Sequence, residues 1–144
     1  MYLSNKLIWT ITDGSQGMIS QVNGLAKQLS SNIQQINADL IFPWSKLQPG
    51  FLPIYKWIFK NDFNFMINPD IIISCGRKSV YASLYLKKIF GKNIVTIHIQ
   101  NPKIKSTNFD FVIAPNHDNF EGKNVLNTRG AIHQFTQDKI NNYK

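Results

Sequence analysis

Apolar and polar positions along the chain predict strands and helices in regular alternation. Residues 6–11, KLIWTI, form a nearly continuous apolar run, as expected for a strand that is covered on both faces. The next apolar positions recur at helical spacing and predict a helix of about three turns; they are Met18, Val22, Leu25 or Ala26, and Leu29.

The same alternation continues to the end of the chain. A second helix is predicted over 78–90, with Ala82, Leu86 and Ile89 lining one face and Gly91 as its C-terminal cap. Further strands are predicted over 32–41, 69–76, 93–102, 109–115 and the start of 124–133. Strands and helices in this order predict an α/β fold with a mostly parallel sheet.

The length of 144 residues and the apolar content of 43% fit one globular domain. We place this domain at 1–134 and interpret 135–144 as a polar tail or a truncated linker. The N-terminal apolar run is interpreted as a first strand and not as a signal peptide. No apolar run approaches the roughly 20 residues of a membrane-spanning helix.

The net charge of +8 favours acidic partners, namely phosphorylated small molecules, anionic lipid or nucleic acid. Nucleic acid is the weakest of these, because the basic residues are dispersed and no known binding module is present. Cys75 is the only cysteine, so the chain forms no internal disulfide and fits a reducing compartment. We expect a cytoplasmic protein with a peripheral place at the inner membrane face.

Parallel sheets bind ligands at the carboxyl ends of their strands, so the residues that follow each strand are the first candidates for a site. After the first strand, Gly14 and Gly17 leave amide groups open at a helix start, where an anion is favoured. Gln21 lies one turn further on, and Gly24 is interpreted as allowing close approach of the helix to the sheet. The alternative is an ordinary turn in which Asp13 caps this helix.

The segment SCGRKS, residues 74–79, has the same order of strand, small residues and helix start. Arg77 and Lys78 at a helix N-terminus oppose the helix dipole unless an anion lies between them. Together with Gly76 they point to a phosphate or carboxylate ligand, or else to two solvated side chains. Cys75 is interpreted as a buried small residue and not as a nucleophile.

His117 and Asp118 follow a later strand and could form an acid–base pair; a capping Asp and a structural His are the alternative that spacing alone favours. A metal site would need another ligand from elsewhere, so we expect no metal and no cofactor. His98 alternates within a strand and is interpreted as a core residue.

Residues 51–60, FLPIYKWIFK, combine aromatic side chains with two lysines. This composition suits a membrane interface, where aromatic rings lie at headgroup depth and lysines extend to the phosphates. A segment that covers the core is the alternative.

Taken together, the segments that follow the strands resemble the mitochondrial-fission (elongated mitochondria) protein family of alphaproteobacteria and plants. The resemblance is carried, in order, by DGSQGMISQVNGLAKQL, PDIIISCGRKS, IHIQNP, FDFVIAPNHD and GKNVLNTRGAIH. It implies a Rossmann-like domain and a glycosyltransferase of the GT-B architecture. The plant relatives imply that the fold also serves as an adaptor.

The resemblance also implies which residues form a site. Asp13 corresponds to a candidate general base, with His117 and Asp118 as further catalytic candidates. The positions expected to bind substrate are Gly14, Gly17, Gln21, Gly76, Arg77, Asn101, Arg129 and Gly130. The chain departs from the family pattern at Ser15, where Lys is usual, at Met18, where His is common, and at Asn101 and Lys103, where Asp and Arg are typical.

Family members are roughly twice as long as this chain, because a GT-B enzyme has two Rossmann-like domains. The resemblance therefore implies the N-terminal, acceptor-side half of such an enzyme, incomplete for catalysis alone. Expected partners are a second-half polypeptide of a split enzyme and an anionic membrane surface or a lipid-linked acceptor. The alternatives are a non-catalytic adaptor or membrane-surface module, and the remnant of a decaying gene.

Overall fold

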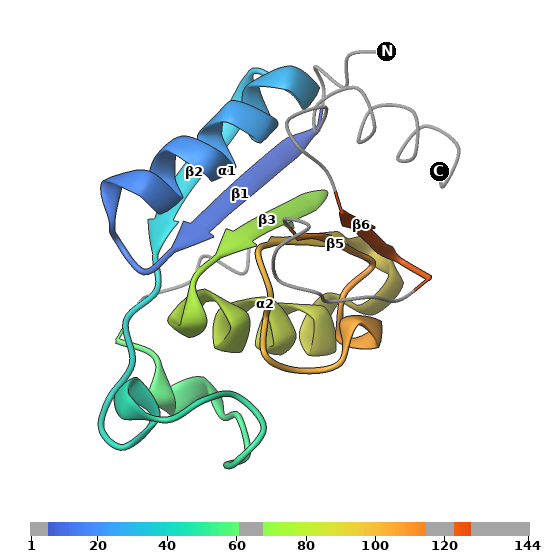
Figure 1. Ribbon diagram of the computed structural model, residues 1–144. Coiled ribbons are helices and arrows are strands. Elements are labelled where there is room, and N and C mark those ends of the chain that lie inside the picture. The colour runs from blue at the N-terminus through green and yellow to red at the C-terminus, as the bar shows by residue number, and fades with distance from the viewer. Residues whose placement is uncertain (1–5, 61–67, 115–122, 128–144) are drawn as a thin grey trace.

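The computed structural model describes residues 6–60, 68–114 and 123–127, and these residues form a single parallel sheet with helices on both faces (Figure 1). The sheet has six strands in the order β2-β1-β3-β4-β5-β6, and every neighbouring pair is parallel. The strands are β1 (Leu7–Thr12), β2 (Asn32–Asn37), β3 (Ile71–Cys75), β4 (Val95–Ile99), β5 (Phe111–Ala114) and β6 (Val125–Asn127). The predicted α/β, Rossmann-like fold with a parallel sheet is confirmed.

Two long helices cover the sheet. Helix α1 (Gln16–Leu29) begins at Ser15, whose hydroxyl accepts a hydrogen bond from the Met18 amide at 3.2 Å. Helix α2 (Arg77–Phe90) ends at Gly91, which adopts φ +58° and donates its amide to the Lys87 carbonyl. The predicted glycine cap at Gly91 is therefore confirmed.

Each face of the sheet buries its own apolar cluster. Ile71, Ile73 and Cys75 of β3 pack with α1 on one face. Ile72 of the same strand packs with α2 on the other face. Because both faces are covered, the central strands are apolar at almost every position, which is why they read as continuous runs in the sequence.

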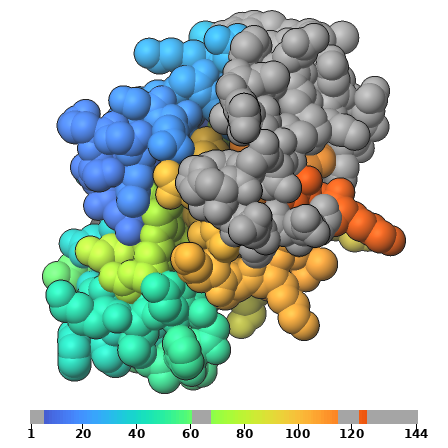
Figure 2. Space-filling model, viewed as in Figure 1, coloured from blue at the N-terminus to red at the C-terminus, as the bar shows by residue number. Residues whose placement is uncertain are grey.

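Between β2 and β3 the chain leaves the sheet and forms a projecting segment, residues 40–60, which we call the lobe (Figures 1 and 2). Its ends are joined by an antiparallel bridge between Leu40 and Phe59. Two short 3₁₀ turns, Trp44–Lys46 and Lys56–Ile58, lie within it. Trp44, Ile58 and Phe59 are buried in the cluster that packs on α2, so the lobe is a packed structure.

Two local predictions are wrong. Ile89 was expected on the buried face of α2, but it is 45% exposed, because Phe90 completes the face that Ala82 and Leu86 begin. Gly24 was expected to permit close approach of α1 to the sheet. It lies on the exposed side of the helix, and a Cβ added there would meet nothing within 4 Å.

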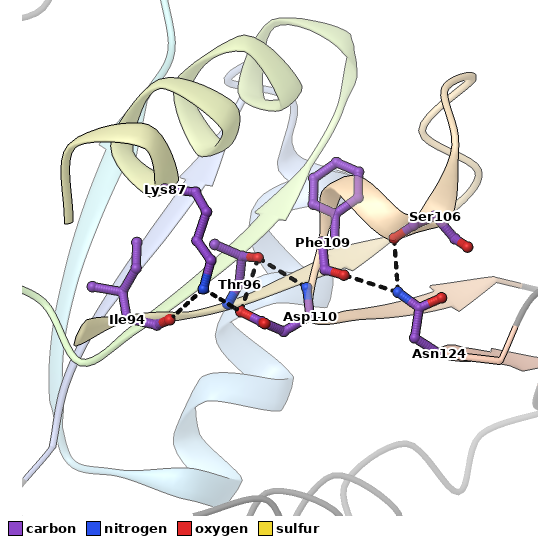
Figure 3. A network of polar contacts seen from close by, with 7 residues as sticks. All are labelled: Lys87, Ile94, Thr96, Ser106, Phe109, Asp110 and Asn124. Carbon is purple, nitrogen blue, oxygen red and sulfur yellow. Dashed lines mark hydrogen bonds and ion pairs between the residues drawn. The ribbon is translucent and has the colours of Figure 1, made fainter. Parts of the chain in front are cut away.

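Asp110, one of the residues on which the family resemblance rests, holds the start of β5 against β4 and α2 (Figure 3). Its Oδ2 accepts the Thr96 amide at 2.8 Å and pairs with Lys87 Nζ at 2.9 Å. Asn124 Nδ2 donates to the carbonyls of Ser106 and Phe109 at 2.7 and 2.9 Å. Asp110 and Asn124 thus stabilise the end of the sheet away from β1.

Within the described ranges, no helix is both long and apolar enough to cross a bilayer.

Candidate functional site

The strand order reverses between β1 and β3. The chain moves outward from β1 to β2 on one side and from β3 to β4 and β5 on the other. In open parallel sheets, ligands bind near such a reversal of strand order, at the carboxyl ends of the strands. Asp13 follows β1 and Gly76 follows β3, so the two most distinctive turns meet at this point.

Asp13 caps the second helix and not the first. One carboxylate oxygen accepts the Lys78 amide at 3.2 Å and the other accepts the Ser79 amide at 3.0 Å. Gly76, which precedes α2, offers no side-chain cap of its own. Asp13 therefore supplies the negative charge that stabilises this helix N-terminus, and Ser15 caps α1.

Gly76 makes room for the Asp13 carboxylate. A Cβ at position 76 would lie 2.7 Å from the Asp13 carboxyl and 2.8 Å from the Met18 sulfur. The residue also adopts φ +111°, a conformation that other residues rarely accept. Steric contact and backbone conformation thus both require glycine here.

The guanidinium of Arg77 binds backbone carbonyls of the lobe. Its Nη1 donates to Leu47 O at 2.7 Å, and its Nη2 donates to Ser45 O. The Tyr81 hydroxyl donates to the same Leu47 carbonyl at 2.9 Å. Arg77 therefore fixes the lobe to the start of α2, a contact between residues about thirty positions apart that the local sequence does not reveal.

A cleft of about 180 Å³ opens beside these residues at the carboxyl ends of β3 and β4. Polar side chains, a glycine and apolar contacts contribute to its surface. The lining residues are Met18, Gln48, Gly76, Arg77, Val80, His98, Gln100, Asn101, Pro102 and Lys103. This volume corresponds to about six water molecules, so the cleft suits one small ligand group.

His98 contributes a neutral imidazole to the cleft. The ring contacts the Ser74 hydroxyl through Nδ1 at 2.8 Å and stacks on Phe109 at 5.1 Å between ring centroids. Burial lowers the pKa of His98 to about 3, so the ring carries no charge near neutral pH. Its interpretation as a core residue is confirmed, since it is 2% exposed.

The loop after β4 holds two non-glycine residues in the left-handed region. Gln100 has φ +84° and Lys103 has φ +63°. The Gln100 amide donates to Ile113 O at 2.7 Å, and the Lys103 amide donates to Asn101 Oδ1 at 2.9 Å. Strained backbone of this kind is concentrated at functional sites, and here it lies on the edge of the cleft.

The structure brings together part of the predicted set. Gly76, Arg77 and Asn101 line the cleft, and the carboxylate of Asp13 lies beside Gly76. The remaining predicted residues of the first loop and helix do not line it; these are Gly14, Gly17 and Gln21, all exposed. His117, Asp118, Arg129 and Gly130 lie outside the described residues.

Sequence reasoning missed the part that His98 plays in the cleft and the contact of its ring with Ser74. A signal was present, because Ser74 and His98 are polar residues in two mostly apolar strands. In the parallel register these two residues are direct partners. A polar residue at the same level of two adjacent buried strands indicates a buried polar contact.

The described residues suit neither thiol nor metal chemistry at the cleft. Burial and the nearby charge of Asp13 raise the pKa of Cys75 to about 11, so its thiol stays protonated at neutral pH. Its interpretation as a buried small residue is confirmed. Across 6–60, 68–114 and 123–127, no cluster of three His, Cys, Asp or Glu residues could hold a metal ion.

Comparison with known proteins identifies the family of this chain. Residues 16–144 match the family model described as "Mitochondrial fission ELM1". The chain belongs to this family. It is 36% identical over 116 residues to the "Uncharacterized protein RP120" of Rickettsia prowazekii. It is 34% identical over 50 residues to the "Mitochondrial fission protein ELM1" of Arabidopsis thaliana. No solved structure matches the chain.

The chain is much shorter than these ELM1-family relatives. The match covers 77% of this chain and 32% of the Rickettsia protein. For the Arabidopsis protein it covers 35% of this chain and 12% of the relative. The chain therefore spans about a third of the length of the Rickettsia relative.

Proposed function

We propose that this chain is the acceptor-side, N-terminal domain of a glycosyltransferase of the GT-B architecture, and that transfer requires a second domain. The observation that carries the proposal is the cleft at the carboxyl ends of β3 and β4, next to the reversal of strand order between β1 and β3, because ligands bind near such a reversal in open parallel sheets. Membership of the ELM1 family is compatible with this reading.

The chemistry of the cleft supports an uncharged ligand. The predicted anion site at the start of α2 already holds the Asp13 carboxylate, and the Arg77 guanidinium binds lobe carbonyls. A neutral imidazole, amide side chains and apolar contacts from Val80 and Pro102 line the cleft, with Lys103 as the one lining cation besides Arg77 among the described residues. Hydroxyl groups fit such a surface better than a diphosphate does, so this half suits an acceptor sugar and not a nucleotide-sugar.

Asp13 is our candidate for the base that deprotonates the acceptor hydroxyl. Each of its oxygens accepts one amide, which leaves a second lone pair on each, and the carboxyl lies beside the cleft at Gly76. His117 and Asp118 remain proposed catalytic residues. A second-half polypeptide and a lipid-linked acceptor are the proposed partners.

A non-catalytic adaptor is the second candidate function. It is favoured by the lobe, which exposes several aromatic side chains that do not line the cleft. Purification of the chain from its own cells distinguishes the two functions. Recovery of an equimolar second Rossmann-like polypeptide supports the split enzyme, whereas recovery of the chain alone as a stable monomer favours the adaptor.

Binding measurements by NMR test the division of labour directly. The probes are N-acetylglucosamine, glucose and mannose. We expect at least one of them to bind weakly and to shift the amide signals of Gly76, Gln100 and Asn101. UDP-N-acetylglucosamine should not bind with micromolar affinity. Gln100→Ala should weaken saccharide binding, and Gln34→Ala, an exposed residue on β2, should not. Micromolar binding of the nucleotide-sugar, or no cleft shifts with any saccharide, would contradict the proposal.

A further inference from the structure

The lobe presents a cluster of exposed aromatic rings. In the described part of the chain five large apolar side chains are exposed, and four of them belong to the lobe: Phe42 at 76%, Phe51 at 74%, Trp57 at 60% and Tyr55 at 45%. Tyr55 and Trp57 stack at 5.3 Å, and Trp57 contacts the edge of Trp44 at 5.1 Å. The exposed aromatic rings thus belong to one segment, the lobe, which projects from the molecule as the teal and green atoms in Figure 2.

These rings are exposed on a well-anchored framework. Trp44 is buried, and its Nε1 donates to Pro53 O at 2.9 Å across the lobe. Arg77 and Tyr81 donate from α2 to lobe carbonyls, as described above. The backbone that carries Tyr55 and Trp57 is therefore held while their rings face solvent. An exposed apolar patch of this kind marks an interaction surface.

The charge of the lobe has one sign. Lys46, Lys56 and Lys60 are exposed, and residues 40–60 contain no Asp, no Glu and no Arg. Protein–protein interfaces are enriched in Arg and depleted in Lys, so this composition is unlike theirs. Aromatic rings with lysines are instead typical of the membrane interface, where rings lie at headgroup depth and ammonium groups reach lipid phosphates.

We propose that the lobe is a peripheral membrane-binding site that inserts its aromatic rings among the headgroups of an anionic bilayer. Phe51 and Trp57 supply apolar contact, and the three lysines supply attraction to the negative surface. The proposal does not depend on sugar transfer, because none of the exposed aromatic rings and lysines of the lobe lines the cleft.

Co-sedimentation of the full chain with vesicles tests the proposal. Vesicles of equal parts phosphatidylglycerol and phosphatidylcholine should bind the chain at low salt, and vesicles of phosphatidylcholine alone should bind it far more weakly. Trp57 is the one exposed residue among the three tryptophans of the chain. Brominated phosphatidylcholine in the anionic vesicles should therefore quench its fluorescence on binding.

Matched variants separate the lobe from the overall positive charge. Replacing Lys46, Lys56 and Lys60 with Gln should weaken vesicle binding about a hundredfold. Each lysine near an anionic surface contributes about 1 kcal/mol to binding, and roughly 1.4 kcal/mol corresponds to a tenfold change in affinity. The control replaces the same number of exposed lysines outside the lobe, namely Lys27, Lys92 and Lys105, and should cause a far smaller loss. Phe51→Ser, at a ring with little contact to the fold, should weaken binding about tenfold.

Four results would overturn the proposal. The first is absence of binding to anionic vesicles, and the second is equal loss of binding in the two triple-lysine variants. The third is binding without quenching by the brominated lipid, which would place Trp57 outside the bilayer. The fourth is concentration-dependent self-association that Phe51→Ser abolishes, which would assign the lobe to contact between copies of this chain.

Discussion

Replacing Asp13 with Ala should destabilise the fold by about 2 kcal/mol, although no catalytic role is needed to explain the loss. The carboxylate accepts two backbone amides of α2, from Lys78 and Ser79, and no other side chain caps that helix. Removing a helix cap costs about 0.5–2 kcal/mol, and hydrogen bonds to a charged group lie at about 1.5–3 kcal/mol. Asp13→Asn keeps one acceptor and should cost about half as much.

Urea unfolding at pH 7, followed by circular dichroism, measures this effect, and Ser15→Ala is the internal reference. Ser15 caps α1 through a single exposed hydrogen bond of 3.2 Å, so its loss should cost only about 0.5–1 kcal/mol. If Asp13→Ala costs no more than Ser15→Ala, the assignment of Asp13 as the cap of α2 is wrong.

A double-mutant cycle with Gly76 measures the energetic coupling between positions 13 and 76. Gly76→Ala should cost about 3 kcal/mol, because it combines a φ of +111° with a contact of 2.7 Å to the Asp13 carboxyl. In the Asp13→Ala background that contact is gone, while the φ and the contact of 2.8 Å to Met18 remain. The cost of Gly76→Ala should then fall by about 1 kcal/mol. Strict additivity of the two substitutions would refute the packing of Asp13 against Gly76.

Three further predictions concern other parts of the fold. Gly17→Ala and Gly24→Ala should each raise the free energy of unfolding by about 0.5–1 kcal/mol, since a Cβ at either position meets nothing within 4 Å; thermal melts check this. His98→Gln should remove the contribution of this histidine to the pH dependence of the free energy of unfolding, which is up to about 1.4 kcal/mol per pH unit. The wild-type imidazole has a pKa near 3 in the folded state and near 6.5 in the unfolded state, so the free energy of unfolding decreases as the pH is lowered from about 6.5 to about 3. Urea titrations from pH 7 to 4 compare the two proteins. Arg77→Ala should loosen the lobe and speed its cleavage by trypsin at Lys56, as mass spectrometry of timed digests would show.

Periodicity predicted the alternation of strands and helices because both faces of the sheet are covered, which leaves long apolar runs such as Ile71–Ile73. The lobe was harder to predict. In residues 51–60, Ile58 and Phe59 cover the core as one alternative of the sequence analysis predicts, while Trp57 and Tyr55 face solvent and the membrane interface stays a proposal. No simple period separates these two sets of residues in a segment built from short 3₁₀ turns and extended backbone.

The sequence also identified the correct turns but assigned some of their side chains to different partners. The alternative in which Asp13 caps a helix assigned it to the helix that follows directly, yet its partners are 65 and 66 residues away. Arg77 was expected to face a ligand, whereas it binds carbonyls 30 and 32 residues earlier in the chain. Both assignments depend on how distant loops meet at the sheet edge, which local spacing does not encode.

The Asp13 carboxylate at the start of α2 can also be regarded as a ligand that the domain carries for itself. Because it is tethered, it occupies the two amides at an effective concentration that free phosphate in a cell would have to exceed. An anion such as inorganic phosphate would therefore have to displace this carboxylate in order to bind the two amides. The domain in this way carries its own intramolecular inhibitor of anion binding at the start of α2.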